Sequence, residues 1–281
     1  MQNRIAVVYL VWLPYDISLL EDFLKSYKEY KSKVAHDLYV IFNGRVADSN
    51  IDEHLKLIQL NCDTRVNYLE LAGGQDIDAY FFTANQIKHE LILFFNSYSK
   101  ISAHSWLETY CDNFKKEVGL ISATGSYQSY YSAVFQTNNL LPDFQKGIVA
   151  NFRKYKLFVK AFLYWRFLFK PFPNPHVRTN AFMIRRELFL QLKYKRMKSK
   201  FEAYQFESGR NSLTNQVLDK GYKVIVVDKH GAAYESQNWA KSKTFWISKQ
   251  ENLLVSDNQT QLYADAEQSQ QVKMRKLVWG I

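Results

Sequence analysis

The stretch ELILFFNSYSKIS, residues 90–102, decides the fold that the sequence predicts. Five consecutive apolar residues, 91–95, run directly into the small polar residues Asn96 and Ser97, which Tyr98 follows. A short, wholly apolar run bounded by turn-forming residues is typical of a buried strand in a parallel sheet. The polar residues would then lie at the carboxyl end of that strand, where open α/β sheets bind their ligands.

The chain before this stretch alternates strand and helix patterns. Apolar runs typical of buried strands occur at 5–13 and 38–42, and a further short strand is expected at 66–71. Apolar residues recur at helical spacing in 17–30, 51–60 and 76–88. This order with short connections predicts an α/β protein, in which helices cover both faces of an open and mostly parallel sheet.

The second half of the chain is less regular. Strand patterns occur at 118–123, 180–184 and 224–227, and a helix is expected near 186–192. The stretch FESGRNSLTNQVLDKG, residues 206–221, is expected to form a loop, then a helix with its N-cap at Asn211 or Ser212. The glutamine-rich tail, 264–281, is expected to pack only near its end.

Composition and known motifs narrow the class of protein. Of the 281 residues, 47% are hydrophobic, which is enough for a sizeable core. The two cysteines give no disulfide framework, and no apolar run approaches the roughly 18 to 20 residues that span a bilayer. Arg4 precedes an apolar run, but no small-residue cleavage site follows it, so we predict a cytoplasmic protein that begins with a strand. The motifs GxGxxG after the first strand and GxxxxGK[ST] are absent, which disfavours dinucleotide dehydrogenases and P-loop enzymes.

Positive charge is concentrated in one segment. Residues 146–200 contain fifteen Lys or Arg and one acid, so the segment carries +14 while the whole chain carries +10. Within it, 146–170 is predicted to be one long amphipathic helix, with Arg153, Lys156 and Lys160 opposite an apolar stripe. The stripe consists of Tyr155, Phe158, Val159, Phe162, Trp165 and Phe169. We predict that this helix lies on an anionic membrane surface, the alternative being a helix packed on its own domain. No nucleic-acid-binding motif accompanies the basic residues, so a nucleic-acid partner is not expected.

At this point the sequence resembles the GT-A glycosyltransferases, which use nucleotide sugars and have a Rossmann-like half and an acceptor half. The resemblance covers most of the chain to about residue 230 and rests on the order of elements and on several stretches. These stretches are LYVIFNG (38–44), GGQDIDAYFFTAN (73–85), ELILFFNSYSKIS (90–102) and FESGRNSLTNQVLDKG (206–221). The pair VGLISATGS (118–126) and PHVRTNAFMIRRELF (175–189) is similar to a subgroup that assembles bacterial surface polysaccharides.

The resemblance implies that the two halves of the chain bind different substrates. It implies a nucleotide-sugar-binding half, 1–126, and an acceptor-binding half, 127–263, within a single GT-A domain followed by the tail. Residues expected to bind the donor are Trp12, Asn43, Gly73, Gly74, Asp76, Asn96, Ser97 and Tyr98. His176 and Arg178 are expected to contact the acceptor or the diphosphate.

The resemblance also implies that Glu207 is the catalytic base. Ser208 and Gly209 would let the backbone turn so that the carboxylate faces the cleft. The following helix would favour the ionised form of Glu207, and the alternative reading is an acid that merely stabilises the start of that helix. Glu202 is the nearest rival, but it lies among lysines that would hold it in a solvated ion pair.

One departure concerns the metal. Asn96 and Tyr98 occupy the two aspartate positions of the family's Asp-x-Asp motif. A hard divalent cation prefers anionic oxygens, which a neutral amide and a phenol do not supply at neutral pH. We therefore expect no metal and no other cofactor, and a transfer that inverts configuration. The expected partners are a nucleoside-diphosphate sugar and a glycan or lipid-linked acceptor at the inner face of the cell membrane. The alternative is a catalytically inactive binding or scaffold protein on the same fold.

Overall fold

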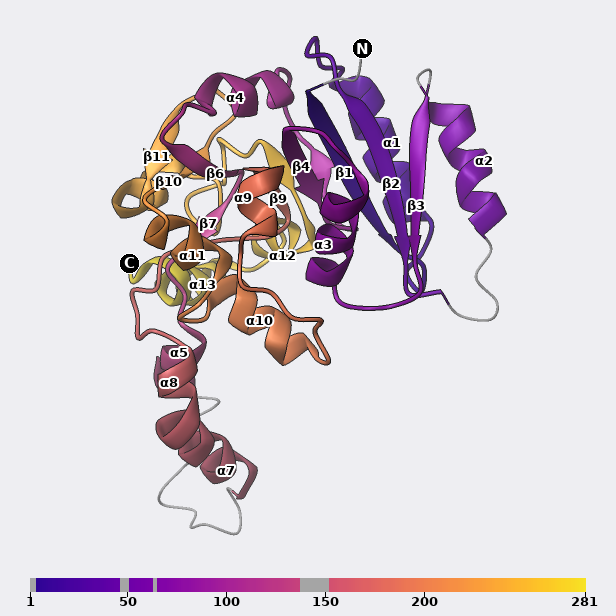
Figure 1. The fold of residues 1–281 in the computed structure, drawn as a ribbon. Coiled ribbons are helices and arrows are strands. Elements are labelled where there is room, and N and C mark those ends of the chain that lie inside the picture. The colour runs from indigo at the N-terminus through magenta and orange to yellow at the C-terminus, as the bar shows by residue number, and fades with distance from the viewer. Residues whose placement is uncertain (1–3, 46–50, 63–64, 137–151) are drawn as a thin grey trace.

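A single large sheet forms the centre of the fold (Figure 1). The structure, a computed structural model, describes residues 4–45, 51–62, 65–136 and 152–281. Within these ranges the sheet has eight strands in the order β11-β10-β6-β9-β4-β1-β2-β3. Their bounds are β1 Ile5–Trp12, β2 Asp37–Asn43, β3 Val66–Leu71, β4 Leu91–Phe95, β6 Val118–Ser122, β9 Ala181–Arg185, β10 Lys223–Val227 and β11 Ala233–Glu235.

The sheet is mostly parallel, with one antiparallel strand inside it. β1 pairs in parallel with β2 and β4, β2 with β3, and β6 with β10. β9 lies between β4 and β6 and is antiparallel to both, while β11 is an antiparallel edge strand. The start of β9 therefore lies at the same edge as the end of β4, because Ala181 pairs with Phe95.

Helices cover both faces of the sheet, as the uninterrupted apolar strands predict. Alternate residues of β1 point to opposite faces, so Val8 packs in one core cluster and Val7 in the other. The first face is covered by α3 Asp76–Gln86, α9 Arg186–Leu190 and α11 Leu213–Asp219. The second face is covered by α1 Ser18–Glu29, α2 Ile51–Asn61 and α4 Trp106–Asn113. The predicted α/β class and the order of the first seven elements are confirmed.

The remaining elements surround the carboxyl edge of the sheet or project from it. Two short ribbons pair β5 Lys100–Ile101 with β12 Val255–Ser256, and β7 Gly125–Ser126 with β8 His176–Val177. The other helices are α5 Tyr130–Gln136, α7 Phe152–Lys160, η2 Ala161–Trp165, α8 Arg166–Leu168, α10 Lys200–Ser208, η3 Ser236–Ser242, α12 Asn258–Ala264 and α13 Gln268–Trp279. The tail packs at its end, as expected, because Val278 and Trp279 are buried. No helix in the described ranges is both long enough and apolar enough to cross a bilayer.

Two sequence predictions need correction here. The stretch that begins at Phe206 does not start as a loop, since 206–208 form the last turn of α10. The predicted helix 146–170 is not one continuous α-helix. Its first part, 146–151, lies outside the described residues, and the described part contains the π-helical turn η2. A π-helical turn shifts the helical register, so the predicted aromatic face divides: Trp165 is buried while Phe162 is exposed.

Candidate active site

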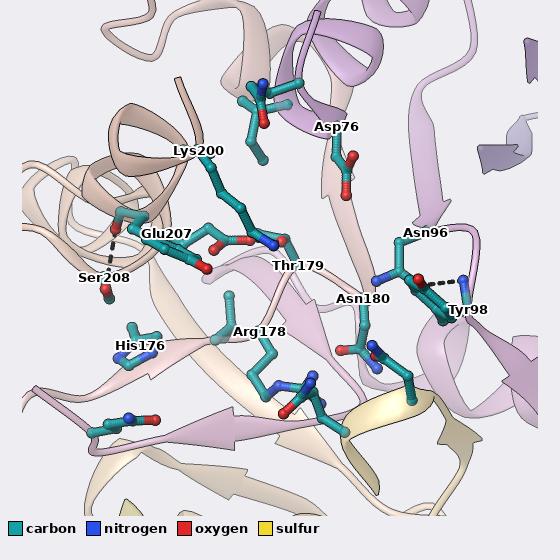
Figure 2. Close-up of a pocket in the computed structure, with 18 of the residues that line it drawn as sticks. Asp76, Asn96, Tyr98, His176, Arg178, Thr179, Asn180, Lys200, Glu207 and Ser208 are labelled. Atoms are coloured by element: carbon teal, nitrogen blue, oxygen red, sulfur yellow. Dashed lines mark hydrogen bonds between the residues drawn. The ribbon is translucent and has the colours of Figure 1, made fainter. Parts of the chain in front are cut away.

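A cleft of about 600 Å³ opens at the carboxyl ends of β1 and β4 (Figure 2). Its size is within the range of about 300 to 1,000 Å³ that small-molecule sites occupy. Three parts of the chain form its walls: the loops after the parallel strands, the segment 176–180 that leads into β9, and one face of α10. This is where an open α/β sheet is expected to bind its ligand.

The glycine loop before α3 brings Asp76 into the cleft. Gly74 has a φ of +145°, and a Cβ there would lie 2.8 Å from the Cβ of Asp78, so the loop requires glycine. Asp78 accepts a hydrogen bond from the backbone N–H of Gln75 at 2.6 Å, which fixes the start of the helix. Asp78 therefore has a capping role, and Asp76, the first residue of α3, lines the cleft.

Two of the residues predicted to bind the sugar nucleotide instead hold the backbone of the cleft loops through hydrogen bonds. Asn43 is fully buried and donates a hydrogen bond from Nδ2 to the carbonyl of Gly74 at 3.1 Å. Ser97 is also buried, and its Oγ accepts a hydrogen bond from the backbone N–H of Trp12 at 3.1 Å. Both residues position the cleft without lining it, and Gly73 does not line it either.

Aromatic residues form the wall at the end of β1. Trp12, Tyr15 and Tyr98 all line the cleft, and the rings of Tyr15 and Tyr98 are 5.0 Å apart. The indole of Trp12 lies against Gly44, where a Cβ would come within 2.5 Å of the ring. The interaction of Tyr15 with Tyr98, together with burial, raises the pKa of Tyr15 to about 12. This wall is neutral at physiological pH and offers flat apolar surfaces to a ligand.

Asn96 directly follows β4 and lines the cleft. Its Oδ1 accepts hydrogen bonds from the backbone N–H of Tyr98 at 3.1 Å and from the hydroxyl of Ser99 at 2.9 Å. Figure 2 shows the side-chain oxygen turned toward Tyr98 and the amide nitrogen turned toward Asn180. The Asn96 side chain thus presents a hydrogen-bond donor, its amide N–H, to the cleft.

Glu207 occupies the wall opposite the glycine loop. It is the penultimate residue of α10, and its Oε1 accepts a hydrogen bond from the hydroxyl of Thr179. Burial raises the pKa of Glu207, and the nearby Asp76 adds to the rise, whereas Thr179 and the cations lower it. Gly209 ends the helix, and a Cβ there would lie 2.4 Å from the carbonyl oxygen of Gln205. The alternative reading, in which Glu207 merely stabilises the start of the following helix, is wrong, because Glu207 lies in the last turn of α10.

Lys200 was missed from the sequence, although it lies on the same helix face as Glu207. Residues seven apart on an α-helix differ by two turns, so their side chains share a face. Ala203 and Tyr204 occupy the same face, and all four residues line the cleft. The Lys200 ammonium lies 5.8 Å from the ring centroid of Tyr204 and makes no hydrogen bond or ion pair with the described residues. Figure 2 shows Lys200 extending into the cleft beside Glu207 and Thr179.

Asp76 faces the same space from the other side. Its side chain is reached by solvent through the cleft, but the walls around it raise the pKa of its carboxyl group, and Lys200 partly offsets the rise. The cleft therefore places two carboxylates and one ammonium group around a common space. A pair of carboxylates with raised pKa values in a cleft is a frequent property of functional sites.

Arg178 is largely committed to the protein itself. Its guanidinium makes an ion pair with the buried Asp257 at 2.6 Å and lies 4.1 Å from the ring centroid of Phe245. One of its nitrogens, Nη1, is buried and has no hydrogen-bond partner among the described residues. Arg178 lines the cleft as predicted, but most of its charge is neutralised by Asp257.

His176 lines the cleft as an uncharged residue. Burial lowers its pKa to about 4, so the ring is neutral at pH 7. Its Nδ1 hydrogen-bonds to the carbonyl oxygen of Asn174 at 2.8 Å. A carbonyl can only accept, so Nδ1 carries the proton and Nε2 is left as an acceptor. His176 can bind a hydroxyl group but cannot neutralise a diphosphate.

Asn180 is a further cleft residue that the sequence did not single out. It is 2% exposed, and its Oδ1 accepts a hydrogen bond from the hydroxyl of Thr124 at 2.8 Å. Its Nδ2 is buried without a hydrogen-bond partner among the described residues. Buried polar groups are normally satisfied, so an unpaired donor in a cleft wall is consistent with a ligand contact. Thr179 and Asn180 directly follow Arg178, so the signal available was their position just before a strand.

The side chains that follow β4 do not suit a hard cation as ligands. The oxygen of Asn96 already accepts two hydrogen bonds, and Tyr98 offers a phenol rather than a carboxylate. In the described ranges no group of three or more His, Cys, Asp or Glu residues is placed to hold a metal. The absence of metal use remains a prediction.

The architecture described above is that of the GT-A fold of nucleotide-sugar transferases. Its features are the strand order, the antiparallel strand between parallel neighbours and the cleft at the carboxyl edge. Of the comparisons with known proteins, only the one with solved structures found a likeness. No family model and no curated protein matches the sequence.

Solved structures of this class resemble the chain. A mannosyltransferase from Pyrobaculum calidifontis, solved with GDP-mannose and Mn²⁺, has 11% sequence identity and a TM-score of 0.50 over 86% of this chain. The chain covers 60% of the length of that mannosyltransferase. A 4-diphosphocytidyl-2C-methyl-D-erythritol synthase from Anaerococcus prevotii has 11% identity and a TM-score of 0.47, covering 80% of this chain and 88% of its own. At 11% identity the likeness to the mannosyltransferase shows the fold alone.

Proposed function

We propose that the protein is an inverting glycosyltransferase that transfers a sugar from a nucleoside-diphosphate donor to a hydroxyl group of a glycan or lipid-linked glycan. The observation that carries the proposal is the position of Glu207, whose carboxylate stands in the cleft at the carboxyl edge of the sheet. Its Oε1 is held by Thr179, and no hydrogen bond to Oε2 is present within the described ranges. Oε2 is thus available to accept a proton.

The reaction requires a base on one side of the sugar and charge stabilisation on the other. Glu207 takes the proton of the acceptor hydroxyl while that oxygen attacks the anomeric carbon. The bond between the anomeric carbon and the diphosphate oxygen breaks, and the diphosphate leaves with the electron pair. Attack from the face opposite the leaving group inverts the configuration. Burial raises the pKa of Glu207, which strengthens it as a base.

Side chains rather than a metal stabilise the departing diphosphate in this proposal. Lys200 supplies a mobile positive charge, and its ammonium is not committed to another described residue. Asn96 and Asn180 supply N–H donors from the strand side of the cleft. Such preoriented donors and cations stabilise developing charge strongly in an enclosed cleft. Arg178 has a supporting role, because Asp257 already neutralises much of its charge.

We place the nucleobase of the sugar nucleotide at one end of the cleft and the acceptor sugar at the other end. Trp12 and Tyr15 offer flat rings on which the nucleoside can pack. His176 offers Nε2 as an acceptor to a sugar hydroxyl. We further propose, from the resemblance of the sequence, that the glycan belongs to bacterial surface polysaccharide.

A second candidate is a binding protein that has lost catalysis. Asn96 and Tyr98, where metal-binding carboxylates stand in relatives of this fold, favour it. The two candidates predict different outcomes when purified protein is incubated with nucleoside-diphosphate sugars. The enzyme releases nucleoside diphosphate, slowly to water and faster once an acceptor is added. The binding protein retains the donor in calorimetry with no release. Absence of both binding and release across uridine, guanosine, cytidine and thymidine donors contradicts both.

A further inference from the structure

We propose that the outward face of a projecting helical arm docks onto an anionic bilayer surface. The helical arm is the segment α7–η2–α8, residues 152–168. Figure 1 shows it projecting away from the sheet, with α5 beside its base. The arm is therefore placed to reach a flat surface that the body of the protein does not touch.

Large apolar side chains are concentrated on the outside of the arm. Six of the thirteen exposed large hydrophobic residues of the described chain lie within it. They are Phe152 (64% exposed), Val159 (49%), Phe162 (48%), Leu163 (59%), Tyr164 (51%) and Phe167 (62%). Such a cluster exceeds the scattered apolar residues that are normal on a protein surface.

The opposite side of the arm is already packed against the protein. Ala161, Trp165 and Phe169 are buried in one cluster with Val134 of α5. The predicted membrane-facing stripe included Trp165 and Phe169, and this part of the prediction is wrong. Phe158 also packs inward, with its ring centroid 5.3 Å from that of Phe135 of α5, whereas Val159 and Phe162 of the predicted stripe stay exposed.

The charge of the arm identifies the partner. Residues 152–170 contain six Lys or Arg and no acid. Lys156, Lys160 and Arg166 are exposed, and the Arg166 guanidinium lies 4.6 Å from the ring centroid of Phe167. Arg166 thus lies among the exposed rings, whereas the Lys160 ammonium, 5.9 Å from the ring centroid of Trp165, flanks the packed side. Exposed rings with cations among and beside them suit the headgroup region of an anionic leaflet, where rings insert and cations meet phosphate. A second copy of this face is a poor partner, because symmetric association would oppose like charges.

The base of the arm is continuous with the cleft wall. Trp165 and Phe169 contact Tyr130 at ring-centroid distances of 4.9 and 5.0 Å, and Tyr130 contacts Tyr204 at 5.5 Å. Tyr130 and Tyr204 both line the cleft. Docking of the arm would hold this wall near the bilayer, which suits a lipid-linked acceptor. This last point rests on the proposed function, whereas the membrane contact itself does not.

Vesicle sedimentation of the whole protein tests the contact without any activity measurement. Phosphatidylcholine vesicles are compared with vesicles that also contain phosphatidylglycerol. We expect binding to the anionic vesicles that weakens as salt is raised. The double variant Phe162→Ser/Phe167→Ser should bind about tenfold more weakly for each residue changed. The matched control, Leu60→Ser/Leu262→Ser, removes exposed leucines elsewhere and should bind like the parent.

A second pair of variants separates charge from apolar contact. Lys156→Gln/Lys160→Gln should weaken binding about fivefold for each lysine, while the control Lys28→Gln/Lys249→Gln should not. Three results would overturn the proposal: no binding to either vesicle, equal binding to both vesicles, or binding that neither arm variant reduces. Concentration-dependent dimerisation lost in the phenylalanine variant, without vesicle binding, would assign the face to self-association instead. A failed glycosyltransferase assay leaves these outcomes unaffected.

Discussion

The substitution Glu207→Gln tests the proposed chemistry most directly. Glutamine keeps the shape of the side chain and keeps an oxygen that can accept the hydrogen bond from Thr179. What it removes is the ability to take a proton. The ground-state cleft should therefore be preserved while the transition state loses its base.

The expected size of the effect follows from this geometry. General-base catalysis contributes about 10² to 10⁴ in rate. Lys200 and the amide donors remain in the variant, so stabilisation of the leaving group is retained. We expect a loss of about 10³ in the transfer rate, which corresponds to about 4 kcal/mol of transition-state free energy. Donor affinity should change little.

The assay measures release of nucleoside diphosphate by chromatography, with donor binding followed by calorimetry. The matched control is Glu202→Gln on the same helix, because Glu202 pairs with the exposed Lys195 outside the cleft. This control should transfer at the parent rate. If Glu207→Gln folds, binds donor and transfers sugar as fast as the parent, Glu207 is not the base and the proposed mechanism fails.

Three further predictions concern the same cleft. Replacing Lys200 by methionine should slow transfer about 10²-fold or more, because a group that stabilises the developing charge is removed. The control Lys198→Met should transfer at the parent rate. Equal rates for both variants would rule out the role of Lys200. Turnover measured in EDTA should match turnover with added Mn²⁺ or Mg²⁺, because the Asn96 oxygen is already engaged; loss in EDTA that metal restores would refute this. The raised pKa of Glu207 means that the folded state holds this proton more tightly than the unfolded state, so stability falls as pH rises from the ordinary glutamate pKa to the raised one. Glu207→Gln should therefore melt at a higher temperature than the parent at neutral pH, and the difference should vanish at acidic pH; a lower melting temperature at neutral pH would contradict it.

The first half of the fold was predictable because β1 and β4 at the centre of the sheet are wholly apolar. Buried parallel strands such as β1 and β4 must be hydrophobic on both faces, so their sequences form unbroken runs that contrast with the amphipathic helices between them. The turn at Asn43 and Gly44 adds a local signal that needs no tertiary information. Bounds in this half therefore differ from the structure by only a few residues.

The site was harder to predict, because its residues come from separate segments. Glu207 and Arg178 were found through the motif resemblance, and both line the cleft. Lys200 was hidden in a basic run in which sequence alone does not mark one lysine as different. Its relation to Glu207, seven residues later, becomes visible only once the stretch is recognised as a helix. Asn43 and Ser97 were singled out as well, but polar residues at strand ends can also be buried supports, and neither of the two lines the cleft.

The register of the helical arm was unpredictable for a related reason. A regular period of 3.6 residues predicts a single apolar face for this helix, and the sequence prediction places that face on the membrane. The π-helical turn at Ala161–Trp165 breaks the period, and two apolar faces result. Trp165, the last residue of the turn, packs in one cluster with Val134 of α5, a contact that the helical period alone does not reveal.

The antiparallel strand β9 has a consequence for how the cleft resists opening. Both edges of β9 are hydrogen-bonded, to β4 on one side and β6 on the other, so amide exchange there requires two ladders to separate together. The carbonyl of Asn180, just before β9, also accepts hydrogen bonds from the backbone N–H of Asn96 and from the Ser99 hydroxyl. Deuterium should therefore enter β9 among the last strands of the sheet and the helical arm among the first segments. The wall that carries Thr179 and Asn180 should thus belong to the slowest-exchanging unit, and α10 on the facing wall is the element expected to adjust when a ligand binds.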